Sequence, residues 1–200
     1  MRAIALLALV TPLALGQPLT QGERDRALSE LHAGRKMFLD ALAGLTPAQL
    51  DYKPAPDRWS IREIAEHVIQ TEESLFKLIT EKILKSPPQP EKATPQQRSK
   101  DELVLKNQLD RTQKRQAPPE LQPTGRRRSL EELVTEFKAK RDRTISWVRE
   151  TQAPLRLHFA PSGDLGDLDA YQWIMLLAGH TERHVEQIRE VKESPGFPKP

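Results

Sequence analysis

The chain has 200 residues, of which 37% are hydrophobic and 30% charged, enough for one domain with a hydrophobic core. Its formal net charge of +3 arises from interspersed acidic and basic residues, which indicates solvated helix surfaces and argues against a nucleic-acid-binding protein. The absence of cysteine excludes disulfides and thiolate metal sites, so any metal must be bound by histidine, carboxylate or carbonyl groups.

The N-terminal residues differ in composition from the remainder of the chain. Residues 3–15 are almost continuously hydrophobic but too short to span a bilayer comfortably, and Ala14-Leu15-Gly16 has the small-x-small pattern of a cleavage site. We therefore expect residues 1–16 to be a signal peptide and the mature protein to be secreted or periplasmic, outside the membrane. An uncleaved membrane anchor is the alternative interpretation.

Four long segments show the hydrophobic period of an α-helix. They cover about residues 20–45, 60–84, 129–153 and 169–192, and proline or glycine follows each of them. Ser60 and Ser129 are predicted N-caps, because each is followed three residues later by a glutamate.

The connections between these segments are long. Residues 86–128 have proline-rich ends and a predicted short helix at 100–114, and residues 155–159 form a predicted extended piece within the next loop. Four helices with such connections predict an all-α fold, a four-helix bundle with long crossover connections, as a single domain over residues 20–198.

Two of the five histidines give the strongest chemical signal. At 100° per residue, His180 and His184 project from one face of the fourth helix, within about 20° of Trp173 at the centre of its apolar stripe. Burying two adjacent imidazoles is unfavourable unless each has a polar partner, and one shared metal ion would serve both. Hydrogen bonds to carbonyl or carboxylate groups are the alternative.

A third ligand must come from another helix, and His67 at the rim of the second helix's apolar stripe is the candidate. His32 and His158 have no such placement. Three neutral histidines leave a coordination position open, as in catalytic sites, and Zn²⁺ or Ni²⁺ are the expected ions.

The residues around the pair offer few further catalytic groups. Thr181 stands where metalloproteases of the H-E-x-x-H type have their general base, and Glu182 projects to the opposite side of the helix. Gln187, one turn beyond His184, is a candidate for orienting a ligand or the substrate, with an ordinary polar residue at the edge of the apolar stripe as the alternative.

Two motifs resemble those of the DinB-like (YfiT-like) family. Residues 59–67, WSIREIAEH, resemble the motif that opens its second helix, and residues 180–188, HTERHVEQI, resemble its closing motif. Residues 169–173, DAYQW, and the tail at 191–198 are also similar. The resemblance covers about residues 22–198.

This resemblance implies an up-down-down-up bundle with a metal on His67, His180 and His184, and frequent dimerisation, so that a homodimer is one expected assembly. Some relatives are thiol S-transferases, and one is a mycothiol-dependent isomerase. We therefore expect a metal-dependent hydrolase or thiol S-transferase with a small-molecule substrate. A non-catalytic metal- or small-molecule-binding module is the alternative.

Overall fold

The structure is a computed structural model that describes residues 16–112 and 115–199, and the expected signal peptide falls almost wholly outside these ranges. Its four long helices are α1 (Gln21–Leu42), α3 (Ile61–Lys77), α6 (Leu130–Glu150) and α7 (Ala170–Glu193). Within the described ranges, no helix is both long and apolar enough to cross a membrane.

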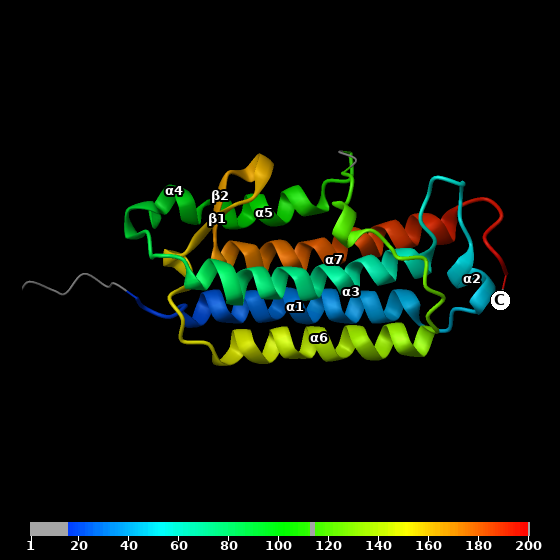
Figure 1. The fold of residues 1–200 in the computed structure, drawn as a ribbon, viewed down its shortest axis with the longest axis horizontal. Coiled ribbons are helices and arrows are strands. Elements are labelled where there is room, and N and C mark those ends of the chain that lie inside the picture. The colour runs from blue at the N-terminus through cyan, green and yellow to red at the C-terminus, as the bar shows by residue number, and fades with distance from the viewer. Residues whose placement is uncertain (1–15, 113–114, 200) are drawn as a thin grey trace, which may run out of the picture.

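The four helices pack as the predicted all-α bundle (Figure 1). Helices α1 and α7 run in one direction, and α3 and α6 run in the opposite direction. Each of α1 and α3 packs against both α6 and α7. Because α3–α7 and α1–α6 are antiparallel while α1–α7 and α3–α6 are parallel, long connections are needed, as predicted.

Side-chain caps fix where the long helices begin. The predicted capping boxes at Ser60 and Ser129 are present, and Thr20 and Asp169 form two more. The first helix ends at Leu42, three residues earlier than expected, and α2 (Pro47–Asp51) follows it as a short turn capped by Thr46. Helix α3 continues through a π-helical turn (Leu78–Lys82) and a 3₁₀ turn (Ile83–Lys85).

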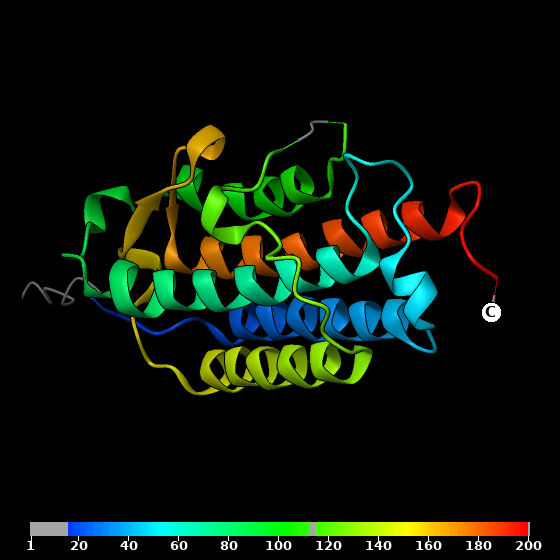
Figure 2. The same cartoon turned by 45° about the vertical axis from the view of Figure 1, so that its right-hand side comes forward.

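The long connection carries short elements of its own. A 3₁₀ turn (Pro90–Lys92), α4 (Pro95–Arg98), α5 (Lys100–Leu109) and η4, a 3₁₀ turn (Pro119–Leu121), follow in order. Helix α5 ends earlier than the predicted 100–114. It packs alongside α7, outside the four-helix bundle (Figure 2).

A small hairpin precedes α7. Strand β1 (Phe159–Pro161) pairs antiparallel with β2 (Asp167–Asp169), around a 3₁₀ turn at Gly163–Leu165. The expectation of an extended piece at 155–159 is wrong for most of its length, because Leu155–Leu157 forms a 3₁₀ turn whose Leu157 N–H donates to the carbonyl of Pro154.

The hydrophobic core consists of two clusters placed one after the other along the bundle. One includes Ala27 and Leu31 of α1 and Leu177 of α7, and the other includes Phe38 of α1 and Val185 of α7. Between them, each long helix contributes polar or small residues, which together form a central polar layer. Its described members are Gly34, His67, Thr71, Glu72, Arg141, Thr144, His180, Thr181 and His184.

Candidate metal centre

Three histidine side chains converge in the polar layer, at the contact between α3 and α7. The Nε2 atom of His180 lies 3.2 Å from Nε2 of His67 and 3.1 Å from Nε2 of His184. The structure thus brings together the three histidines that the sequence singled out, with their ligand atoms all within 4.8 Å of one another.

This geometry suits a divalent metal ion. Two nitrogens each about 2.0–2.1 Å from a tetrahedral ion are separated by about 3.3 Å. The observed Nε2–Nε2 distances of 3.1 and 3.2 Å are close to that value. Three imidazole nitrogens without a thiolate or a carboxylate form a donor set that Zn²⁺ and later first-row metals accept.

Hydrogen bonds on the opposite side of two rings set their tautomers. Nδ1 of His67 lies 2.7 Å from the carbonyl oxygen of Leu121, and Nδ1 of His184 lies 2.8 Å from Oε1 of Gln187. Since both oxygens can only accept, each Nδ1 must carry the proton, which leaves the Nε2 lone pairs of His67 and His184 directed at Nε2 of His180. Metal-binding histidines commonly have such partners.

Burial keeps these imidazoles neutral. It lowers the pKa of His67, although the hydrogen bond to Leu121 acts in the opposite direction. Burial lowers the pKa of His184 to about 3, with His67 adding to the effect, and it lowers the pKa of His180 well below the usual value, with His184 and then His67 adding to it. Neutral rings are the form that binds a metal.

The remaining histidines lie elsewhere. His32 is exposed on α1. His158 is buried, but its Nδ1 donates to the carbonyl of Ser86 at 2.8 Å, and it does not belong to the three-histidine cluster. Glu182 is half-buried, and burial, followed by the nearby Glu30 of α1, raises its pKa. Its position towards α1 agrees with the expectation that it projects away from the histidines.

A buried ion pair beside the histidines is the feature that sequence reasoning missed. Arg141 of α6 donates from Nε and Nη2 to the carboxylate of Glu72 at 2.7–3.1 Å, and from Nη2 to Oγ1 of Thr181 at 2.6 Å. Gly34 of α1 gives the guanidinium room, because a Cβ there would lie 3.3 Å from Nη1. The available signal was a charged residue in the apolar stripe of α6, one turn after Phe137.

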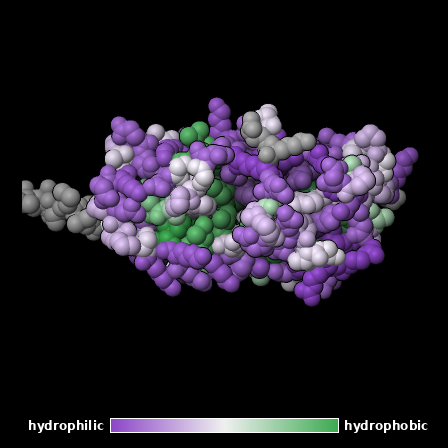
Figure 3. Space-filling view, turned by 45° about the horizontal axis from the view of Figure 1, so that its top comes forward, coloured by the Kyte–Doolittle hydropathy of each residue, from purple (hydrophilic) through white to green (hydrophobic). Residues whose placement is uncertain are grey.

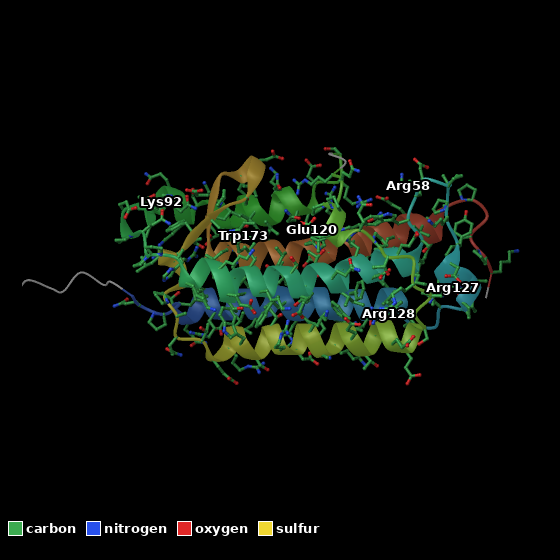
Figure 4. All side chains as sticks on the ribbon, in the orientation of Figure 1. Arg58, Lys92, Glu120, Arg127, Arg128 and Trp173 are labelled. Carbon is green, nitrogen blue, oxygen red and sulfur yellow. The ribbon has the colours of Figure 1, made fainter. Side chains whose placement is uncertain are left out.

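Hydrophobic side chains continue from the histidines along α7. Trp173 and Leu176 precede His180 by about two turns and one turn, and Leu176 is partly buried, as are Leu75 of α3 and Leu165 of the hairpin. In the view of Figure 3, hydrophobic residues lie recessed among hydrophilic ones, on the half of the molecule nearer the N-terminal end of the described chain. Figure 4 labels Trp173 on α7 and Glu120 on η4.

Comparisons with known proteins match most of the chain. The family model of the DinB superfamily matches residues 30–188. The uncharacterized protein YuaE of Bacillus subtilis (strain 168) is 26% identical over 166 residues, which are 83% of this chain and 97% of YuaE.

A solved structure shows the same fold. YfiT from Bacillus subtilis, described as a probable metal-dependent hydrolase with an unusual four-helix bundle topology, aligns over 94% of both chains with a TM-score of 0.55 and 12% sequence identity. With the family model covering residues 30–188, the chain belongs to the DinB superfamily.

Proposed function

We propose that the protein is a metal-dependent enzyme in which His67, His180 and His184 hold one divalent ion, Zn²⁺ or Ni²⁺, through their Nε2 atoms. The observation that carries the proposal is the convergence of three Nε2 atoms while the Nδ1 atoms of His67 and His184 are engaged elsewhere. The description of YfiT as a probable metal-dependent hydrolase supports it.

The reaction class follows from the donor set. A divalent ion held by three neutral imidazoles leaves a position for a further ligand and supplies Lewis-acid activation of a water molecule or of an external thiol. Hydrolysis and thiol S-transfer of a small molecule are therefore the two activities to assay. The chain's own part is to orient the rings, through Leu121 and Gln187, and to place the partly buried side chain of Leu176 one turn before His180.

A non-catalytic metal-binding module is the second candidate. One observation favours it: no aspartate or glutamate belongs to the histidine cluster among the described residues. A carboxylate beside the metal is the usual general base of hydrolases with histidine-bound zinc. Turnover of an ester, an amide or a thiol–electrophile pair by the metal-loaded protein would favour the enzyme, and metal binding without turnover would favour the module.

Metal analysis tests the site itself. We expect about one equivalent of Zn²⁺ in the wild type and none in the His180→Ala/His184→Ala variant after loading and desalting. His32→Ala is the matched control, since His32 is exposed on α1, and it should retain the ion. Equal metal content in all three proteins would overturn the proposal.

The cellular setting is proposed from the sequence alone. We infer that residues 1–16 direct export and are removed, so that the mature protein begins at Gln17 and acts in a secreted or periplasmic location. N-terminal sequencing of the protein from cells checks the cleavage. We also propose a homodimer, which the size of the purified protein in solution tests.

A further inference from the structure

The connection between α5 and α6 crosses α3 beside His67. Its 3₁₀ turn η4 contacts α3, and the carbonyl of Leu121, the last residue of this turn, accepts the hydrogen bond from Nδ1 of His67. The orientation of one proposed metal ligand therefore depends on a backbone atom that is 54 residues away in the sequence. Something must hold this segment in place.

Glu66, the residue immediately before His67, provides that attachment. Its side chain is buried, and its carboxylate accepts from Thr124 at two points, from Oγ1 to Oε1 at 2.5 Å and from the backbone N–H to Oε2 at 3.2 Å. Hydrogen bonds to a charged acceptor are stronger than those between neutral groups. Glu66 and His67 thus fasten the same short segment at Thr124 and Leu121.

The segment between these points is stiff. Residues 118–124 contain three prolines, which restrict the backbone, and the N–H of Leu121 donates to the carbonyl of Pro118 at 2.9 Å. We call residues 118–124 the strap. Because the strap is stiff, fixing Thr124 also restricts where the carbonyl of Leu121 can lie.

We infer that Glu66 and Thr124 are positioning residues for the metal centre, an inference that rests on the proposed function. Their hydrogen bonds hold the strap so that Leu121 keeps the Nδ1 proton of His67 engaged and its Nε2 directed at His180 and His184. Without them, the ring of His67 loses its fixed orientation. By thermodynamic linkage, metal binding and strap docking must strengthen each other by the same factor.

A hydroxyl deletion tests the positioning role. Thr124→Val removes the Oγ1 donor while keeping a similar shape, Thr124→Ser restores a hydroxyl, and Thr135→Val on the exposed face of α6 is the matched control. Chelator competition should show Zn²⁺ affinity about tenfold weaker in Thr124→Val, largely recovered in Thr124→Ser and unchanged in Thr135→Val. Losing the hydrogen-bond partner of a ligand itself costs about 10–100-fold, and Thr124 acts on that partner through the strap, so the lower end of this range is expected.

Hydrogen exchange gives a second readout that does not depend on activity. In the metal-free protein, the hydrogen-bonded amides of Leu121, Gln122 and Thr124 should exchange faster in Thr124→Val than in the wild type, and Zn²⁺ should slow them in the wild type. A Thr124→Val protein that binds Zn²⁺ within twofold of the wild type, or a wild-type strap unaffected by Zn²⁺, would overturn the positioning role alone. A wild type that binds no metal would overturn the proposed function, and the inference with it.

Discussion

The buried ion pair of the polar layer leads to a quantitative prediction about stability. The side chains of Arg141 and Glu72 are 0% and 1% exposed. In Arg141→Met, the carboxylate of Glu72 loses the guanidinium and keeps only the hydrogen bond from the hydroxyl of Thr144, at 2.7 Å. Removing one partner of a buried pair costs about 3–5 kcal/mol, a large part of the stability of a typical domain.

Removing both charges should cost much less. In Arg141→Met/Glu72→Leu no charge remains unpaired, and the neighbouring hydroxyls retain acceptors one turn earlier in their own helices. Thr144 lies 3.2 Å from the carbonyl of Lys140, and Thr181 lies 3.5 Å from that of Leu177. Replacing a buried pair with apolar residues is often neutral or stabilising, so we expect the double variant within about 1 kcal/mol of the wild type.

Urea unfolding followed by circular dichroism, on protein stripped of metal with a chelator, measures these free energies. Arg35→Met is the control, since it breaks the exposed Arg35–Asp142 pair and should cost at most about 1 kcal/mol. The reasoning is refuted if Arg141→Met costs less than about 1 kcal/mol, or if the effects of the two substitutions simply add, since a coupled pair must be non-additive.

Three further predictions concern the metal ligands and the packing beside them. Gln187→Ala removes the acceptor of His184 Nδ1, and we expect about a tenfold loss of Zn²⁺ affinity in chelator competition; unchanged affinity would mean that packing alone orients the ring. Because the pKa of His184 is about 3 in the fold and near 6.5 when unfolded, the metal-free folded protein binds fewer protons than the unfolded chain between these values. The free energy of unfolding should therefore fall as the pH drops from about 6.5 towards 3, and it should fall less in His184→Asn. Urea unfolding at pH 7 and pH 5 compares the wild type with this variant, and equal declines would contradict the lowered pKa of His184. Gly179→Ala would put a Cβ 2.9 Å from Cβ of Gln108 and displace α5, which should lower the free energy of unfolding by about 1–3 kcal/mol. Gly22→Ala, with open space around it, should raise that free energy by about 0.5–1 kcal/mol. Thermal unfolding compares the two alanine variants, and similar effects would argue against close α5–α7 packing.

Local patterns in the sequence predicted the parts of the fold that depend on local interactions. The capping boxes at Ser60 and Ser129 are set by residues three positions apart, and both are present. The shared face of His180 and His184 follows from one helical turn, and their Nε2 atoms lie 3.1 Å apart. The placement of Gln187 beside His184 is also within reach of such reasoning, since the two residues are three positions apart on one helix.

Contacts between distant segments were less predictable. The approach of His67 to the pair depends on how α3 packs against α7, and the sequence alone favoured it only as a candidate at the stripe rim. The Arg141–Glu72 pair joins residues 69 positions apart, so neither partner identifies the other. The acceptor for His67 is a backbone carbonyl in a loop, and no side chain at Leu121 signals that role.

The position of the histidines in the core has a thermodynamic consequence. The two hydrophobic clusters on either side of the polar layer fix α3 and α7. The three histidine rings therefore meet inside the core, where apolar side chains would pack more favourably than imidazoles. Burial of three imidazoles thus lowers the stability of the metal-free bundle, whereas an ion at 100 times its Kd adds about 2.7 kcal/mol to the folded state. The three histidines lower the free energy of unfolding of the metal-free protein, and a bound ion compensates for this loss. Leucine at these positions would give higher stability without an ion, so metal binding explains the histidines better than selection for stability does.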